Sequence, residues 1–576
     1  MDVSNDPPCG QIEPSEACAT SLVGALKDNL GSSAIPVPGQ PVKAEIIHNL
    51  ATTIDTNIRV VSEQVTETRS LEWTRNRFAP QLHKLPEEVL STIFMNVVFN
   101  FDHSGIPDST LMEQDIYTIY RRLYRLLGVC STWRGLIMTR GVFWSTIPMV
   151  TNLFTGELGP FGLSLKRAGG SNLHLVAVAD AESPDISKEL IEILAEYAPR
   201  FYAINLSIGN HQVLVDAIHK LLEKYETGSL TKLSIRSLND SGNLSWFPSD
   251  ESYILRLGDP HQILFTELAK ALATFRVHGV HFYWQTITFS SRLVELWIEN
   301  ITLGWDDAII SFMQAASSAS QLQVLKIITV DTLRRRNSTS GTIVVPPRVV
   351  FPNLQSLYIR DIYCNTLTTL LRMIAPGSYH FTFFLRETSL QNVDELEHDF
   401  DGIEPGQPEF GLADIGELCD ALERVPVHTL MLSEHLASGR LTGPTLQILL
   451  GAMPNLKTLK LHRWVFDEVM WGSLKRPLSD QTDPRGRFPA LESLQLITTT
   501  IVTDEGFQEM VASHPLQQVL LGGTITADYP VDMAQNPLDK GNNMVKWLQD
   551  NVQDFRLVED QYCPPEFQPV RWRFTY

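Results

Sequence analysis

The chain has 576 residues, of which 43% are hydrophobic and 19% are charged, as expected for a globular protein with more than one domain. Its net charge is −20 and its pI is about 5.2, which argues against nucleic acid or an anionic membrane as the main partner, because both require a basic surface. The six cysteines have no C-x-x-C spacing, so we expect free thiols in a reducing compartment, cytoplasmic or nuclear. The sequence contains no secretory signal pattern and no apolar run long enough for a membrane span.

The N-terminal part of the chain separates into two segments. Residues 1–45 are rich in Pro, Gly, Ser and Ala, a composition that predicts a disordered tail. Residues 46–78 carry apolar positions at helical spacing, which predicts a helical lead-in to the next domain. This helix would pack on that domain or, as the less favoured alternative, form a short coiled coil with a partner.

Two linked motifs follow in residues 80–148. In "LPEEVLSTIF" (residues 85–94), proline suits the first helical position and the two glutamates suit the first turn, where the helix dipole favours carboxylates. The apolar residues of this stretch and the next turn form one broad helical face: Val89, Leu90, Ile93, Phe94 and Val97. About thirty residues later, "LYRLLGVCSTWRGLIMTRGVFWSTI" (residues 123–147) again repeats apolar residues at helical spacing, until Gly141 breaks the pattern.

Taken together, "LPEEVLSTIF", "VCSTWRGLI" and "FW" resemble the F-box, a small all-helical domain, over about residues 82–147. One departure is an insertion near residues 99–117, which we expect to form a surface loop and a longer start to the second helix. The resemblance implies binding of a Skp-type adaptor protein. The positions that match the motif are Leu85, Pro86, Val89, Ile93, Val129, Trp133 and Leu136, and some of these must instead form the core of the domain.

A short leucine-rich unit recurs from residue 170 onward, with helical stretches between most of its copies and a period of 25–35 residues. Clear copies are "LTKLSI", "LVELWI", "LQVLKI", "LQSLYI", "VHTLML", "LKTLKL", "LESLQL" and "LQQVLL". A plain α/β sheet would not require this pattern at every strand. Residues 160–530 therefore resemble an irregular leucine-rich-repeat horseshoe, a solenoid whose units stack into one core. The expected fold class is α/β, with a small helical domain before the repeats and with residues 531–576 capping the last unit.

The unit also predicts which side chains lie on the concave face of the repeats. If the leucines point inward, alternation along each strand places the intervening residues outward. The candidate substrate-binding side chains are Trp297, Lys326, Tyr358, Arg360, Lys460 and His462. Their bases suit an acidic or phosphorylated protein, and their aromatic rings are typical of interface anchors. The equally favoured alternative is that they are ordinary solvated strand residues without a binding role.

The sequence contains no P-loop, no G-x-S-x-G motif, no H-E-x-x-H motif and no dinucleotide-binding motif, so we expect no catalytic residue, cofactor or metal. The histidines of "HGVH" are better explained as ordinary strand residues than as ligands. An F-box before leucine-rich repeats resembles the non-catalytic substrate receptors of cullin-RING (SCF-type) ubiquitin ligases, which form large families in fungi. Two alternatives remain open. The chain is an adaptor-binding scaffold outside ubiquitination, or a repeat-based binding protein whose first helices are only a cap.

Overall fold

A computed structural model of the chain describes residues 85–100, 111–150, 160–180, 186–225, 229–238, 246–335, 347–395, 408–433, 441–477, 488–526 and 536–568, and six positions between 52 and 63. The chain divides into two compact units, Met1–Pro86 and Glu87–Tyr576. In the first unit, the six described positions between 52 and 63 are helical and exposed. The tail predicted over residues 1–45 and most of the lead-in predicted over residues 46–78 lie outside the described residues.

The second unit begins with three α-helices and a short 3-10 helix and then alternates strands with helices. The first group is α3 (Glu87–Phe99), α4 (Leu111–Val129), α5 (Ser131–Thr139) and η3 (Gly141–Trp144). The later helices are α6 (Pro160–Ala168), α7 (Ser187–Tyr197), α8 (His211–Lys224), α9 (His261–Ala271), α10 (Ala308–Ser317), α11 (Cys364–Met373), α12 (Ile415–Leu422), α13 (Gly443–Gly451), α14 (Glu468–Leu474), α15 (Phe507–Ala512) and α16 (Asn543–Asn551).

One mostly parallel sheet of 16 strands runs through the described part of this unit, and its strand order follows the sequence. Its strands are β1 (Thr146–Val150), β2 (Leu173–Ala179), β3 (Phe201–Ile208), β4 (Lys232–Ser237), β5 (Thr274–His278), β6 (Glu295–Trp305), β7 (Val324–Leu333), β8 (Ser356–Arg360), β9 (His380–Leu385), β12 (Val427–Ser433), β13 (Thr458–His462), β14 (Val465–Phe466), β15 (Ser493–Ile501), β16 (Gln518–Ile525), β17 (Asn536–Pro537) and β18 (Asp554–Leu557). A separate antiparallel hairpin consists of β10 (Gln391–Glu395) and β11 (Pro408–Leu412).

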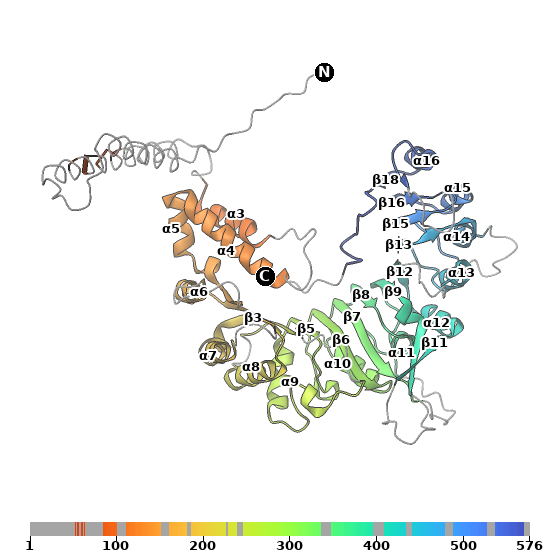
Figure 1. Ribbon diagram of the computed structural model, residues 1–576. Coiled ribbons are helices and arrows are strands. Elements are labelled where there is room, and N and C mark those ends of the chain that lie inside the picture. The colour runs from red at the N-terminus through yellow and green to blue at the C-terminus, as the bar shows by residue number, and fades with distance from the viewer. Residues whose placement is uncertain are drawn as a thin grey trace, which may run out of the picture. The chain divides into compact units, whose positions relative to one another are not determined.

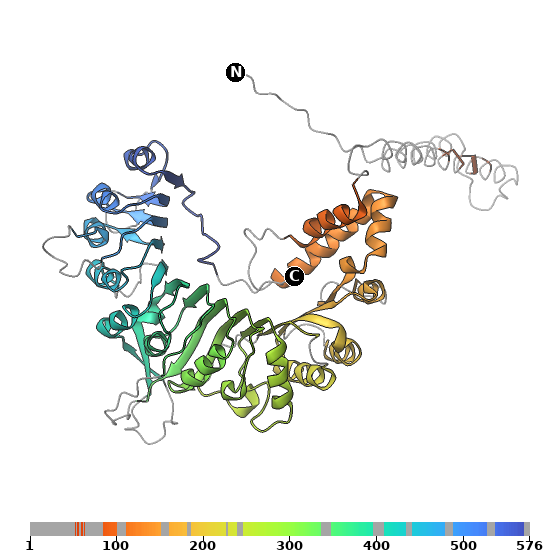
Figure 2. The same ribbon diagram turned by 180° about the vertical axis from the view of Figure 1, so that it is seen from behind.

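The sheet is curved, with helices along its outer side (Figures 1 and 2). Most leucines of the repeated unit point toward the helices and are buried. Leu325 and Ile327 on β7, for example, lie in the same apolar core as Leu459 and Leu461 on β13. Because parallel neighbours keep their register, equivalent residues of successive strands form continuous rows across the sheet. The α/β fold expected from the repeated unit is therefore confirmed.

A backbone bend recurs at one position of the repeated unit. Five non-glycine residues have φ between 47° and 60°, and each lies seven positions after the first leucine of its unit: Asn300, Thr329, Asp361, Arg463 and Thr498. The left-handed conformation is unfavourable for residues with a Cβ atom. Its recurrence at one unit position shows that the units share a backbone path as well as a leucine pattern.

The first three helices correct the sequence interpretation in one respect. The apolar spacing around residues 123–137 indicates a continuous helix, but the chain becomes extended at Cys130, with φ −159° and ψ 169°, and this separates α4 from α5. The turn brings α5 back against α3, so that the ring centroids of Phe94 and Trp133 lie 4.6 Å apart. Most of the loop predicted near residues 99–117 lies outside the described residues, and its last part forms the start of α4.

The C-terminal region only partly follows the predicted cap. Trp547 on α16 packs beside Phe507 with ring centroids 6.4 Å apart, and β18 adds a strand beside β16, so both extend the last unit. The chain then turns onto the inner side of the sheet (Figures 1 and 2), where Phe567 contacts Phe384 on β9. The prediction that the aromatic residues of this region cap the last unit is therefore wrong for Phe567. The final "VRWRFTY" lies outside the described residues.

Candidate functional site

The first candidate site is an exposed apolar stripe on α3. The broad apolar face expected from sequence divides into two stripes, each with a spacing of four residues. Leu90, Phe94 and Val98 are at most 3% exposed and form the core between the helices. The neighbouring stripe remains in solvent: Val89 is 41% exposed, Ile93 37% and Val97 46%.

The same group of helices leaves further apolar and aromatic side chains exposed. They are Tyr117, Tyr124, Val129, Met138 and Val142. Exposed large hydrophobic groups are ordinary when single, but a concentration of eight within residues 87–144 is typical of an interaction surface. The second unit therefore begins with helices that leave eight large hydrophobic side chains exposed.

Polar contacts fix the orientation of these helices. The indole N–H of Trp144 donates to the carbonyl oxygen of Ile137 at 2.9 Å, and the Arg140 guanidinium lies 3.6 Å from carboxylate oxygens of Glu87 and Glu88. The hydroxyl of Tyr120 donates to the carbonyl oxygen of Thr146 on β1, at 2.9 Å. The Tyr120 hydrogen bond thus holds α4 against the first strand of the sheet. The contacts of Arg140 with Glu87 and Glu88 hold the start of α3, which carries the exposed stripe, against the end of α5.

The seven predicted adaptor-binding residues have different environments. Pro86, Val89, Ile93 and Val129 are exposed, and Leu85 is half-buried. Trp133 is also half-buried and contacts Phe94, as described above, whereas Leu136 is 6% exposed and belongs to the core. Leu136 is therefore one of the motif residues that form the core of the domain.

The second candidate site is the inner face of the sheet, where Trp297 lies between two cations. The Arg276 guanidinium carbon is 5.1 Å from the ring centroid of Trp297, and the Lys326 Nζ atom is 4.4 Å from it. Arg276 also makes a two-pronged hydrogen bond to Glu295, with both N–O distances 3.1 Å. The indole N–H of Trp297 donates to Glu299 at 3.1 Å. Neighbouring strands supply all these groups, because the parallel register aligns their side chains in a row.

Further along the inner face, Arg360 and Arg386 lie against one ring. Their guanidinium carbons are 4.6 and 5.2 Å from the ring centroid of Phe384. Both arginines also contact the Asp361 carboxylate, at 3.4 and 3.0 Å. Burial raises the pKa of Asp361, and the two arginine charges oppose that rise.

The six predicted substrate-binding residues all lie on this inner face, but the prediction that they are exposed is wrong. Trp297, Arg360 and His462 are at most 5% exposed, and Lys326, Tyr358 and Lys460 are half-buried. One reason is geometric, since long side chains in adjacent rows cover one another across a concave parallel sheet. The other reason is that a distant part of the chain covers the face.

That part is the segment Glu559–Gln568, which we call the docked segment. Its Glu566 carboxylate lies 2.6 Å from the Lys460 Nζ atom, and its Phe567 ring centroid lies 5.0 Å from that of His462. Its last described residue accepts a hydrogen bond from the Arg360 guanidinium, 3.0 Å from the Gln568 carbonyl oxygen. Sequence reasoning missed these contacts because they join positions up to 208 residues apart without a local signal.

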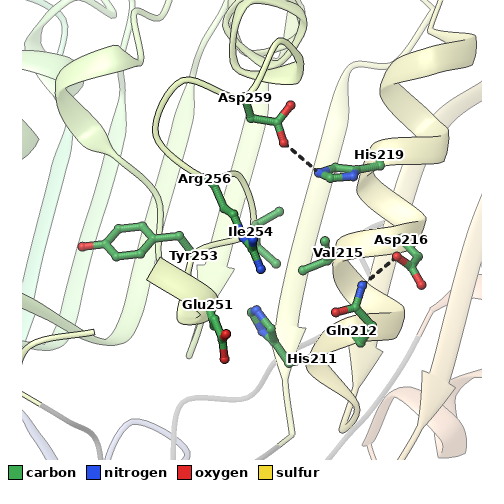
Figure 3. Close-up of a pocket in the computed structure, with 10 residues that line it drawn as sticks. All are labelled: His211, Gln212, Val215, Asp216, His219, Glu251, Tyr253, Ile254, Arg256 and Asp259. Atoms are coloured by element: carbon green, nitrogen blue, oxygen red, sulfur yellow. Dashed lines mark hydrogen bonds and ion pairs between the residues drawn. The ribbon is translucent and has the colours of Figure 1, made fainter. Parts of the chain in front are cut away.

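The third candidate site is a cavity of about 620 Å³ between α8 and the loop that precedes α9 (Figure 3). His219 Nε2 lies 3.5 Å from Asp259 Oδ2, and His261 Nδ1 lies 2.8 Å from Asp259 Oδ1. Burial alone would raise the pKa of Asp259, but the hydrogen bonds from His261 and the nearby histidine charges bring it below its ordinary value. The sequence gives no signal for this group, because His219 lies forty positions before the Asp259-x-His261 pair.

These three residues are the candidate metal ligands within the described part of the chain, since their ligand atoms lie within 4.8 Å of one another. However, the rings of His219 and His261 stack with centroids 4.5 Å apart and planes inclined by 9°. A histidine nitrogen directs its lone pair in the ring plane, so two nearly parallel stacked rings do not converge on one ion. This arrangement instead favours a carboxylate that accepts hydrogen bonds from histidine.

No family model matches the chain, and no curated protein matches it either. Among the described residues, no helix is sufficiently long and apolar to cross a membrane. The candidate sites therefore depend on the geometry of this chain alone.

Proposed function

We propose that the chain is the substrate-recognition subunit of a cullin-RING (SCF-type) ubiquitin ligase. In this proposal, residues 80–148 act as an F-box domain that binds a Skp-type adaptor, and the units from about residue 160 to 530 form a leucine-rich-repeat horseshoe that holds a protein substrate. The chain performs no chemistry itself, because the ubiquitin-transferring components belong to other subunits.

The observation that carries this proposal is the exposed stripe of Val89, Ile93 and Val97. An isolated domain would lower its free energy by turning such residues inward, yet α3 already buries the adjacent stripe and leaves this one in solvent. A preformed apolar helical surface of this kind suits a protein partner that covers it. It also lies within the residues whose motif resembles the F-box.

The repeated sheet supports the second half of the proposal. Stacked units present an extended concave surface, which is a common way to bind another protein. The inner face carries aromatic rings and cations in aligned rows, as described for Trp297, Arg360 and Phe384. Aromatic and arginine side chains are enriched at the centres of protein interfaces.

A binding experiment tests the adaptor proposal on the full chain. The double variant Val89→Glu and Ile93→Glu places two carboxylates in the stripe without removing buried atoms. We expect at least tenfold weaker binding to a purified Skp-type adaptor, about 1.4 kcal/mol. The matched control is Ile448→Glu with Val469→Glu, because those residues are exposed on α13 and α14, at 58% and 62%.

The outcomes separate the alternatives. Adaptor binding that brings a cullin and its RING subunit into the complex supports the ligase proposal. Adaptor binding without a cullin indicates a scaffold outside ubiquitination. If the folded wild-type chain binds no Skp-type adaptor, or if both double variants behave alike, the F-box assignment is wrong and a repeat-based binding protein remains.

A further inference from the structure

The docked segment Glu559–Gln568 occupies the part of the inner face with an apolar floor. Phe567 is 5% exposed and packs with Phe384 and Met431 in one small apolar cluster, separate from the main core. Ile497 completes this cluster within the described residues, and Leu520 and Cys563 pack against it. Strands β9, β12 and β15 each contribute one of the floor residues. The sheet therefore provides a site for one aromatic ring, and the chain fills it with its own.

A cation lies next to this apolar floor. The Lys460 ammonium contacts Glu566, the residue immediately before Phe567, at 2.6 Å. Burial would raise the pKa of Glu566, but the hydrogen bond and the charge of Lys460 outweigh that effect and lower it. The carboxylate is therefore held in its charged form, and the residues that occupy the site are an acidic side chain followed directly by an aromatic one.

The conformation of the docked segment comes from its own short turns. The Phe567 amide donates to the Pro564 carbonyl oxygen at 3.1 Å, and the Gln568 side chain donates to the Cys563 carbonyl oxygen at 3.2 Å. These bonds present Glu566 and Phe567 toward the sheet within a compact peptide. The local geometry can thus be reproduced by a short peptide that has the same sequence but is not joined to the chain.

Two hydrogen bonds also join the segment to the sheet. Thr498 donates to the Tyr562 carbonyl oxygen at 3.1 Å, and Arg360 donates to the Gln568 carbonyl oxygen. Pro565, Glu566 and Tyr562 are themselves exposed. The ion pair is partly exposed and therefore contributes little by itself, whereas joining the segment to the chain raises its local concentration to about the millimolar range, so tethering favours docking.

From this geometry we propose that the inner-face site binds a partner peptide with an acidic residue followed by an aromatic residue, and that the docked segment is its resting occupant. The partner displaces the segment, so the segment limits access to the site and acts as an internal competitor. The inference rests on the proposed function only in taking the inner face as the partner-binding surface.

The test uses a fluorescent peptide, EDQYCPPEFQ, which copies residues 559–568, under reducing conditions. Wild-type full-length chain is compared with Phe567→Ala, which removes the competing ring and leaves the sheet unchanged. We expect the Phe567→Ala chain to bind the peptide at least tenfold more tightly than wild type. Adding Lys460→Glu to the Phe567→Ala chain should abolish that gain. A peptide in which lysine replaces the glutamate before phenylalanine, EDQYCPPKFQ, should restore binding to this double variant.

A second measurement requires no variant. Excess EDQYCPPEFQ peptide added to the wild-type chain should accelerate hydrogen exchange at the Phe567 and Gln568 amides, whereas a peptide ending in EAQ should not. Peptides in which phosphoserine or glutamine replaces the glutamate before phenylalanine then show whether the site requires a carboxylate, accepts phosphate or ignores charge.

Three results would overturn the inference. The first is a Phe567→Ala chain that melts like wild type but does not bind the peptide. The second is peptide binding that is unaffected by Lys460→Glu. The third is unchanged exchange of the segment at saturating peptide, which would make the segment a permanent part of the fold. Because no adaptor is present in these measurements, failure of the ligase proposal leaves them unaffected, and their failure leaves adaptor binding untouched.

Discussion

The helices at the start of the second unit and the inner face of its sheet treat their binding groups in opposite ways. On α3, Val89, Ile93 and Val97 remain exposed although apolar residues gain by burial. On the sheet, charged and aromatic residues that alternation directs outward are largely covered, including Arg360 and Trp297. One surface is open before any partner arrives, whereas the other is already filled.

The difference shows that exposure in the free chain would not identify both proposed binding surfaces. An open apolar stripe requires only encounter with its partner, because little must be rearranged first. A filled site requires that the partner compete with the occupant, which lowers its apparent affinity by the fraction of time the site is closed. The two surfaces should therefore respond differently to mutation.

The largest expected effect separates the two stripes of α3. Phe94→Ala removes a buried ring that contacts Trp133, and we expect it to destabilise the helical region by about 3–5 kcal/mol. Ile93→Ala, one position away but exposed, should change stability by less than about 0.5 kcal/mol. Hydrogen exchange of the α3 amides in the full chain measures both. Equal effects would show that the exposed stripe also packs within the protein.

A pH-dependent effect is expected next, at Asp331 on β7. Burial raises the pKa of this carboxyl from 3.8 to about 7, with a smaller contribution from the Asp361 charge. Because the folded state holds the proton more tightly than the unfolded state, stability should fall as pH rises from about 4 to about 7. A shift of about three pKa units corresponds to roughly 4 kcal/mol.

Asp331→Asn should remove most of that slope, because an amide does not titrate in this range. The variant should stay folded, because the amide oxygen can still accept a hydrogen bond from the Tyr363 N–H, which lies 3.2 Å from the carboxylate in the wild-type chain. Denaturant unfolding at several pH values between 4 and 8 gives the comparison. Parallel curves for wild type and variant would mean that Asp331 titrates normally and that the inner sheet tolerates its charge.

Trp297→Ala should act mainly on stability, with a loss of about 3 kcal/mol, rather than on partner binding alone. Its ring separates Arg276 from Lys326, so removal brings two cations together and leaves Glu299 without the indole donor. Trp297→Phe serves as control, since it keeps the ring between the cations and loses only the donor. A Trp297→Ala chain that melts like wild type would contradict this expectation and would show that the ring contributes little to stability.

The smallest expected effect is the coupling between Lys460 and Glu566. A double-mutant cycle with alanine at both positions should give at most about 1 kcal/mol, because Glu566 is partly exposed. Since the pKa of Glu566 is lowered by docking, its contribution is present above its ordinary pKa and is lost as pH falls through the lowered value. Exchange of the Phe567 amide reports docking. A coupling energy of zero at neutral pH would show that the Lys460–Glu566 ion pair does not stabilise docking and that the Phe567 ring does.

Much of the sheet could be predicted from the sequence, because each unit carries its own signal. Leu357 of "LQSLYI" lies in β8, and Leu459 and Leu461 of "LKTLKL" lie in β13. Such strands are recognisable because apolar periodicity is a local property. The recurrent left-handed residue was not predicted, since only two of its five instances are Asn or Asp, the types that favour that conformation.

The features that escaped prediction depend on distant parts of the chain. The separation of α4 from α5 at Cys130 does not interrupt the apolar spacing, so periodicity alone could not show it. The division of the α3 face depends on where α4 and α5 pack. The docked segment contacts strands far upstream, and its own sequence, EDQYCPPEFQ, has no periodic pattern that indicates where it packs. The exposure predicted from alternation therefore failed at Arg360, Lys460 and His462, which the docked segment contacts, and at Trp297, which neighbouring strands cover.

The docked segment also changes how the sheet can come apart. In a stack whose units contact only their neighbours, unfolding can begin at an end and proceed one unit at a time. Here residues after β18 reach back to β8, β9 and β13, so the last strands cannot fray independently while the segment is in place. The strands from β8 onward are cross-linked by the docked segment, whereas the strands before β8 contact only their neighbours. If a partner displaced the docked segment, the C-terminal half of the sheet would lose this cross-link. Binding of the partner would then lower the mechanical stiffness of that half.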